Sequence, residues 1–100
     1  MMRRFFSISK KSLKEVNHVD ALKIDARVLI NPHSLHPDIN GLHPYVQLFI
    51  CRQAGFVNTL TDIVKRINNS AAQDIIFFCD GGKHRSIFLA DALERVFSNS

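Results

Sequence analysis

Apolar residues recur at helical spacing in two segments of the chain. In residues 56–67, FVNTLTDIVKRI, this spacing predicts an amphipathic helix with an inner face formed by Phe56, Leu60, Ile63, Val64 and Ile67. Residues 86–97, SIFLADALERVF, predict a final helix that turns inward Ile87 or Phe88, Ala90, Leu93 and Phe97. Pro44 suits a first helical position, so YVQLFICR after it predicts a third helix.

Three further segments predict strands. The continuous apolar run DIIFFC at 74–79 is typical of a strand buried on both faces of a parallel sheet. Residues 4–8 predict a half-buried strand, because Phe6 and Ile8 alternate with Ser7 and Ser9. Residues 24–30, IDARVLI, predict a strand that ends before Pro32 and has one face formed by Ile24, Ala26, Val28 and Ile30.

The element order is therefore strand, strand, helices, strand, helix. This order predicts an α/β fold, a single-domain layered sandwich with a mostly parallel sheet flanked by helices. The 100 residues are 46% hydrophobic and 22% charged, which fits one globular domain over residues 1–100. No apolar run approaches the ~20 residues of a membrane helix, so no membrane partner is expected.

The formal charge of +4 is unevenly distributed. Residues 1–14 hold five basic residues and no acid, whereas the rest of the chain has eight basic and nine acidic residues. This distribution excludes a uniformly basic, histone-like surface and leaves a local anion site open. Cys51 and Cys79 show no disulfide or metal spacing, which favours a reducing compartment, the cytoplasm.

The segment from Cys79 to Ser86, between a predicted buried strand and a helix, carries the sharpest chemical signal. A strand, a glycine turn and a helix start present free N–H groups and a positive dipole end to an anion. Lys83 and Arg85 add charge, and Ser86 can cap the helix or donate to an oxygen. The predicted ligand group is a phosphate or another oxyanion, bound by Gly81, Gly82, Lys83, His84, Arg85 and Ser86.

The same segment also has the C-x5-R-S spacing of cysteine-dependent phosphatases. In that alternative Cys79 would be a catalytic thiolate and Arg85 would hold the phosphate. Phe78 stands where those enzymes commonly have a histidine, and Asp80 brings a carboxylate close to an incoming dianion. These two residues favour an inert Cys79 at the strand end.

A second loop, Asn31-Pro32-His33, follows the predicted strand at 24–30. Because parallel strands followed by helices end at one edge of the sheet, His33 and the 79–86 segment are expected to converge there. A histidine at that edge can donate to a phosphate or act as an acid or base near neutral pH. The irregular spacing of His33, His36 and His43 does not indicate a zinc site, and no metal or cofactor is expected.

Together these segments resemble the C-terminal domain of the RapZ (RNase adapter protein) family. The family pattern D-V-R-F-L-x-N-P-H, T-G-L-D and G-C-T-G-G-x-H-R-S-V is similar to Asp25–His33, then Gly41-Leu42, then Cys79–Ser86, in order and spacing. The resemblance covers about residues 3 to 97. GGKHRS is its specific part.

The resemblance implies a regulatory domain and no known catalysis. Family members join this domain to a P-loop nucleotide-binding domain; the domain resembles part of 6-phosphofructokinase, binds small regulatory RNA and senses glucosamine-6-phosphate in enterobacteria. The implied ligand is therefore a sugar phosphate, with an amino-sugar phosphate as one form, and homo-oligomers are implied. The implied binding residues are His33, Gly81, Gly82, Lys83, His84 and Arg85, with Asn31 and Arg27 as supports.

Three departures from the family bear on these expectations. The sequence contains no GxxxxGK[ST] motif, so no nucleotide hydrolysis is implied. Asp80 stands where the family has a neutral threonine. Family members continue past residue 100 into a basic tail, so RNA binding here would depend on residues 3–14 and the anion loop and would fall steeply with salt.

Overall fold

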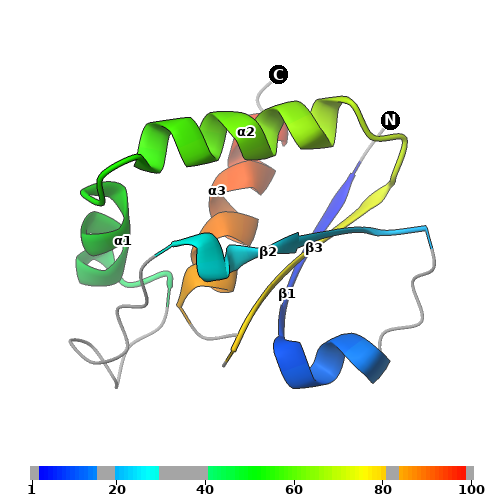
Figure 1. The fold of residues 1–100 in the computed structure, drawn as a ribbon, viewed down its shortest axis with the longest axis horizontal. Coiled ribbons are helices and arrows are strands. Elements are labelled where there is room, and N and C mark those ends of the chain that lie inside the picture. Colours follow the sequence, from blue (N-terminus) through cyan, green and yellow to red (C-terminus); the bar gives the residue numbers. More distant parts are fainter. Residues whose placement is uncertain (1–2, 16–19, 30–40, 81–83, 99–100) are drawn as a thin grey trace.

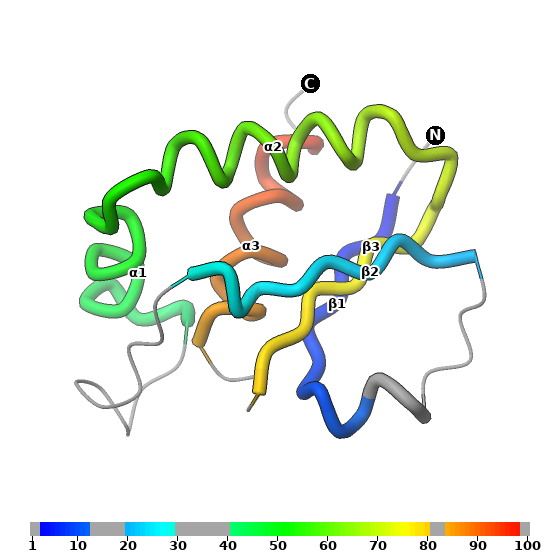
Figure 2. The backbone as a smooth tube through the Cα atoms, viewed as in Figure 1, coloured from blue at the N-terminus to red at the C-terminus, as the bar shows by residue number. Residues whose placement is uncertain are grey.

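The computed structural model describes residues 3–15, 20–29, 41–80 and 84–98 (Figures 1 and 2). Its strands are β1 (Arg4–Ser9), β2 (Leu22–Asp25) and β3 (Asp74–Cys79). Its α-helices are α1 (Pro44–Cys51), α2 (Phe56–Asn68) and α3 (Arg85–Ser98), and its 3-10 helices are η1 (Lys10–Glu15) and η2 (Ala26–Val28). The predicted α/β order is confirmed.

The strands form a parallel sheet with the order β1-β3-β2, so β3 is the central strand. Ser9 lies opposite Cys79, and Asp25 lies opposite Phe78. The carboxyl ends of the three strands therefore share one edge of the sheet, and the loops that follow them start from neighbouring positions. The central position of β3 explains its continuous apolar sequence, because Ile75, Ile76 and Phe77 are all at most 1% exposed.

The core lies between the sheet and the helices. It combines buried residues of β3 with inward residues of the helices, chiefly Ile75, Phe77, Ile63, Ile67, Leu89 and Leu93. Phe5 of β1 adds to it by stacking on Phe77 and on Phe97 at ring distances of 6.5 and 5.9 Å. The alternation predicted over residues 4–8 therefore has the opposite phase: Phe6, expected on the buried side, points to the other face and is 36% exposed.

The predicted strand at 24–30 is wrong at residues 26–29, and residue 30 lies outside the described residues. The carboxylate of Asp25 accepts a hydrogen bond from the backbone N–H of Arg27 at 2.9 Å and caps η2, so the chain turns where the strand was expected to continue. Val28, expected on the same strand face as Ile24, is 64% exposed although Ile24 is buried, and Leu29, expected on the other face, is buried too. This turn places the side chain of Arg27 at the carboxyl edge of the sheet.

The three predicted α-helices are confirmed within one or two residues. α1 begins at Pro44, and Nδ1 of His43 accepts a hydrogen bond from the backbone N–H of Tyr45 at 3.2 Å. α2 follows Gly55, whose φ of 78° is in the left-handed region that favours glycine. Among the described residues, no helix is long and apolar enough to cross a membrane.

Candidate functional site

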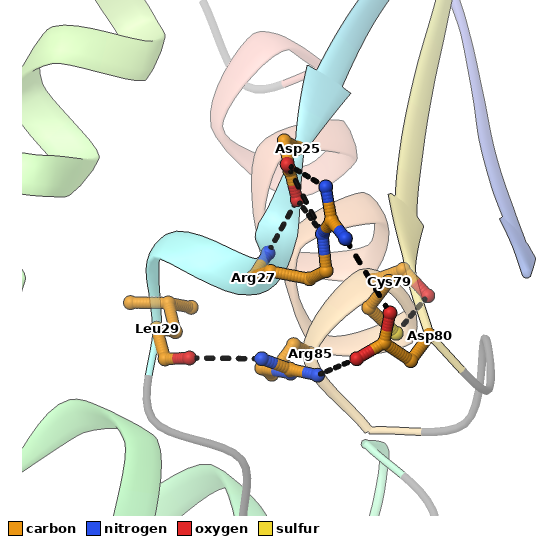
Figure 3. Close-up of polar contacts among 7 residues, drawn as sticks. Asp25, Arg27, Leu29, Cys79, Asp80 and Arg85 are labelled. Carbon is orange, nitrogen blue, oxygen red and sulfur yellow. Dashed lines mark hydrogen bonds and ion pairs between the residues drawn. The ribbon is translucent and has the colours of Figure 1, made fainter. Parts of the chain in front are cut away.

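The candidate site lies at the carboxyl edge of the sheet, between the ends of β2 and β3 (Figure 3). Arg27 comes from η2, directly after β2, and Asp80 is the first residue after β3. Arg85 is the first residue of α3. Because β2 and β3 are neighbours, two arginines that lie far apart in the sequence meet across one carboxylate.

Arg27 is held by Asp25. Its Nε and Nη2 donate to the two carboxylate oxygens at 2.9 and 2.7 Å, a two-point contact that fixes the plane of the guanidinium group. The hydrogen bond from Arg27 lowers the pKa of Asp25 below its ordinary value, and the same contact raises the pKa of Arg27. Arg27 therefore presents a fixed positive charge whose Nη1 points toward Asp80.

Arg85 is buried, with 6% of its surface exposed. Its Nη1 donates to the carbonyl oxygen of Leu29 at 3.1 Å, and its Nη2 lies 3.8 Å from the carboxylate of Asp80. Its Nε is buried and has no hydrogen-bond partner in the described part of the chain. A buried guanidinium group with so few partners is costly unless a further anion compensates its charge.

Asp80 joins the two arginines from the solvent side. Its Oδ1 lies 3.6 Å from Nη1 of Arg27, and its Oδ2 lies 3.8 Å from Nη2 of Arg85. The side chain of Asp80 is 66% exposed. Two guanidinium groups and two carboxylates, those of Asp25 and Asp80, thus form a cluster whose formal charges cancel.

The start of α3 is fixed by close packing against Gly41. A Cβ atom at Gly41 would collide with the carbonyl oxygen of His84 and would lie 2.6 Å from the backbone nitrogen of Phe88. The N–H of Phe88 donates to that same carbonyl at 3.0 Å, so Gly41 packs on the first turn of the helix. His84 itself is 4% exposed. The absence of a side chain at position 41 therefore allows this loop to approach the helix start.

A buried hydroxyl and thiol cluster lies beneath the start of α3. The Cys79 thiol donates to Oγ of Ser86 at 3.2 Å, and the Ser7 hydroxyl donates to the same oxygen at 2.7 Å. Cys79 is 2% exposed and Ser86 is fully buried. A cysteine nucleophile works as an accessible thiolate, whereas this thiol is buried and donates a hydrogen bond to Ser86. The geometry favours a structural role for Cys79 and Ser86.

The structure brings together part of the predicted site. Arg27 and Arg85 meet, with His84 and the Cys79–Ser86 pair adjoining them, but how these residues act on a ligand stays a prediction. The predicted binding residues Asn31, His33, Gly81, Gly82 and Lys83 lie outside the described residues. Sequence reasoning missed Leu29, whose carbonyl binds Arg85, and the packing role of Gly41. No sequence pattern predicts which carbonyl group an arginine will bind, whereas Gly41-Leu42 is one of the segments on which the family resemblance rests.

The basic N-terminal segment is partly used inside the fold. Arg4 makes a two-point contact with the carboxylate of Asp74 at 2.7 and 3.0 Å. Arg3 donates to the carbonyl of Ser70 at 2.9 Å and lies over the ring of Phe97. These arginines sit at the amino end of β1, the opposite end of the strand from the candidate site. Within the described residues, no group of three or more His, Cys, Asp or Glu side chains is arranged to hold a metal ion.

Comparison with known proteins gives a consistent result. The family model of the RapZ C-terminal domain matches residues 5–100. A nucleotide-binding protein of Shewanella amazonensis is 36% identical over 76% of this chain and 31% of its own length, and one of Pseudoalteromonas atlantica is 33% identical over the same shares. A nucleotide-binding protein of Stenotrophomonas maltophilia is 36% identical over 71% of this chain and 28% of its own. The chain thus spans less than a third of the length of these curated relatives.

Proposed function

The chain belongs to the RapZ C-terminal domain family, and from this premise we propose that it is a regulatory domain that binds a phosphorylated small molecule at the carboxyl edge of its sheet. The observation that carries the proposal is the state of Arg85, a buried guanidinium group whose Nε has no partner among the described residues. An oxyanion bound here would supply closer acceptors than the carboxylate of Asp80, which lies 3.8 Å from Nη2 of Arg85.

Two further features support an anion ligand at this position. Arg85 opens a helix of 14 residues, so the positive end of the helix dipole and the N–H groups of the first turn point toward the same edge. Arg27 is aligned by Asp25 and brings a second guanidinium group to it. Ligands of open α/β folds bind outside the carboxyl ends of the strands, which is where this cluster lies.

The ligand we favour is a sugar phosphate, with an amino-sugar phosphate as the first candidate because of the family. The printed names of the relatives mention nucleotides, but those names belong to proteins about three times as long as the matched region. This chain has no GxxxxGK[ST] sequence. A nucleotide is therefore included among the test ligands, so that its binding can be compared with that of the sugar phosphates.

Thermal shift and calorimetry against inorganic phosphate, glucosamine-6-phosphate, glucose-6-phosphate and AMP would test the proposal. A ligand at 100 times its Kd stabilises a folded domain by about 2.7 kcal/mol, which is a readily measured shift in Tm. We expect Arg85→Lys to weaken binding roughly tenfold, because lysine keeps the charge and loses the planar fork. The matched control is Arg4→Lys at the opposite end of β1, which should bind as the wild type does. No binding of any of these ligands would contradict the proposal.

An RNA-adapter role is a second candidate, favoured by the placement of Lys10 and Lys11. Both are exposed and begin η1, which directly follows the carboxyl end of β1, so they lie at the same edge as the arginine pair. Contacts between such lysines and RNA phosphates would release counterions, so the affinity would fall steeply with salt. RNA binding that stays unchanged between low and moderate salt, or that survives Lys10→Gln with Lys11→Gln, would exclude this role for the edge.

A further inference from the structure

Asp80 adds a carboxylate to the site at which we propose that an anion binds. Its oxygens lie 3.6 and 3.8 Å from nitrogen atoms of Arg27 and Arg85. Both separations exceed the ~2.8 Å of a charge-assisted hydrogen bond, and Asp80 is 66% exposed, so the carboxylate borders the two guanidinium groups without being locked onto them. Any oxyanion held by both arginines would be in contact with Asp80.

The chemistry of such a contact depends on whether the oxyanion carries a proton. An ionised carboxylate only accepts hydrogen bonds, so it cannot pair with a fully ionised oxyanion such as sulfate, and the two repel each other. A phosphate monoester has a second pKa of about 6, so near neutral pH a share of it carries a P–OH group. That hydroxyl can donate to Asp80 while the other oxygens accept from the arginines.

The charges of the cluster favour the same species. Asp25 already compensates Arg27 through contacts of 2.9 and 2.7 Å, so a new ligand is met chiefly by Arg85. With Asp80 in place the formal charges of the four groups cancel, and a second negative charge on the ligand has no dedicated partner among them. A protonated, singly charged phosphate fits this arrangement better than a dianion does.

We propose that Asp80 is the specificity-determining residue of the site and that it selects oxyanions with a P–OH donor over fully ionised ones such as sulfate. The inference rests on the proposed anion-binding function. It gives a function to Asp80, an acid at the position where the resembled family pattern has threonine.

The test compares inorganic phosphate with sulfate at about pH 6, where inorganic phosphate carries at least one P–OH group and sulfate carries none. Calorimetry at constant ionic strength would use the wild type, Asp80→Asn and the control Asp91→Asn. Asp91 lies on α3 and pairs with Arg95 at 3.3 Å, so its substitution makes the same charge change on the helix that carries Arg85 without changing the site. Asp80→Thr is the second variant if the asparagine variant unfolds.

We expect the wild type and Asp91→Asn to bind phosphate at least tenfold more tightly than sulfate, about the effect of one hydrogen bond to a charged group. Asp80→Asn should bind the two anions with affinities within about threefold of each other, mainly because sulfate binding improves once the carboxylate is gone. A phosphate-to-sulfate ratio that is the same in the wild type, Asp80→Asn and Asp80→Thr would overturn the inference and leave the proposed function intact. If neither the wild type nor the Asp80 variants bind either anion, the proposed function fails and the inference fails with it.

Discussion

Two pairs of arginines lie at opposite ends of the sheet, and they are used in different ways. At the amino end, Arg4 is 59% exposed and its guanidinium group is matched by the two oxygens of Asp74 at 2.7 and 3.0 Å. At the carboxyl edge, the side chain of Arg85 is 7% exposed and its nearest carboxylate oxygen is 3.8 Å away. These arginines are equal charges when they are counted from the sequence, but Arg4 is matched by a close carboxylate and Arg85 is not. This difference is why we place the proposed ligand at the carboxyl edge.

This difference shows why the location of a charge matters more than its sum. The basic excess of residues 1–14 suggests a nucleic-acid surface when it is only counted. In the structure, Arg3 and Arg4 are bonded to Ser70 and Asp74, so part of this excess holds β1 in place. At the carboxyl edge, the formal charges of Asp25, Arg27, Asp80 and Arg85 cancel, yet the geometry of this cluster supports an anion site.

The largest effect is expected from Arg85→Ala. Truncation leaves the carbonyl of Leu29 without its donor and opens a cavity at the start of α3, which should reduce the free energy of unfolding by about 2–4 kcal/mol. Urea unfolding at neutral pH measures the change. A loss below about 0.5 kcal/mol would mean that Arg85 stabilises the fold no more than an exposed arginine does. The contrast between the two ends of the sheet would then disappear.

Gly41→Ala should come next. The added methyl group meets the backbone of His84 and Phe88, which cannot yield as a flexible side chain does. Overpacking of this kind costs about 1–3 kcal/mol, and the displaced helix start should weaken phosphate binding as well. Urea unfolding and calorimetry on the one variant measure both effects.

The control for Gly41→Ala is Asn69→Ala, a substitution at an exposed residue just after α2. Its backbone is in the right-handed helical region, which alanine adopts without strain, so the free energy of unfolding should change by at most about 0.5 kcal/mol. Equal stability of Gly41→Ala and the wild type would show that the loop does not limit the position of the helix start.

Asp25→Asn should have a smaller, pH-dependent effect. Because the hydrogen bond from Arg27 lowers the pKa of Asp25 in the folded state, its stabilisation is present above the ordinary pKa of about 3.9 and is lost as the pH falls through the folded value. The carboxylate is 37% exposed, so we expect a loss below about 1 kcal/mol at pH 7. Urea unfolding of wild type and variant should converge near pH 2, and a difference that persists there would contradict this assignment.

Arg4→Ala should have the smallest effect. Its contact with Asp74 is short but solvent-exposed on the arginine side, so its loss should cost at most about 1 kcal/mol and should leave phosphate binding unchanged. The same unfolding and calorimetry experiments measure both. A weaker phosphate affinity in this variant would mean that the amino end contributes to binding and would remove the distinction between the two arginine pairs.

Sequence patterns predict the elements with clear periodicity and miss those set by side-chain contacts. The run at 74–79 and the spacing over 56–67 predict β3 and α2 because burial dictates their patterns. The strand predicted at 24–30 is wrong at residues 26–29 because a hydrogen bond from the backbone N–H of Arg27 to Asp25 caps a turn there, and alternation does not indicate such a bond. The glycine-rich segment indicates an anion site, but the burial of Arg85 and its bond to Leu29 depend on the packing of distant segments.

The most direct test of the central claim is a titration of the ¹⁵N-labelled chain with inorganic phosphate, followed by NMR at constant ionic strength. We expect saturable shifts in the side-chain Nε–Hε signals of Arg85 and Arg27 and in the first-turn amides of α3, with the signal of Arg4 unchanged. Shifts that are confined to Arg3 and Arg4, or an Arg85 signal that does not move at any phosphate concentration, would contradict the claim that the carboxyl edge is the anion site.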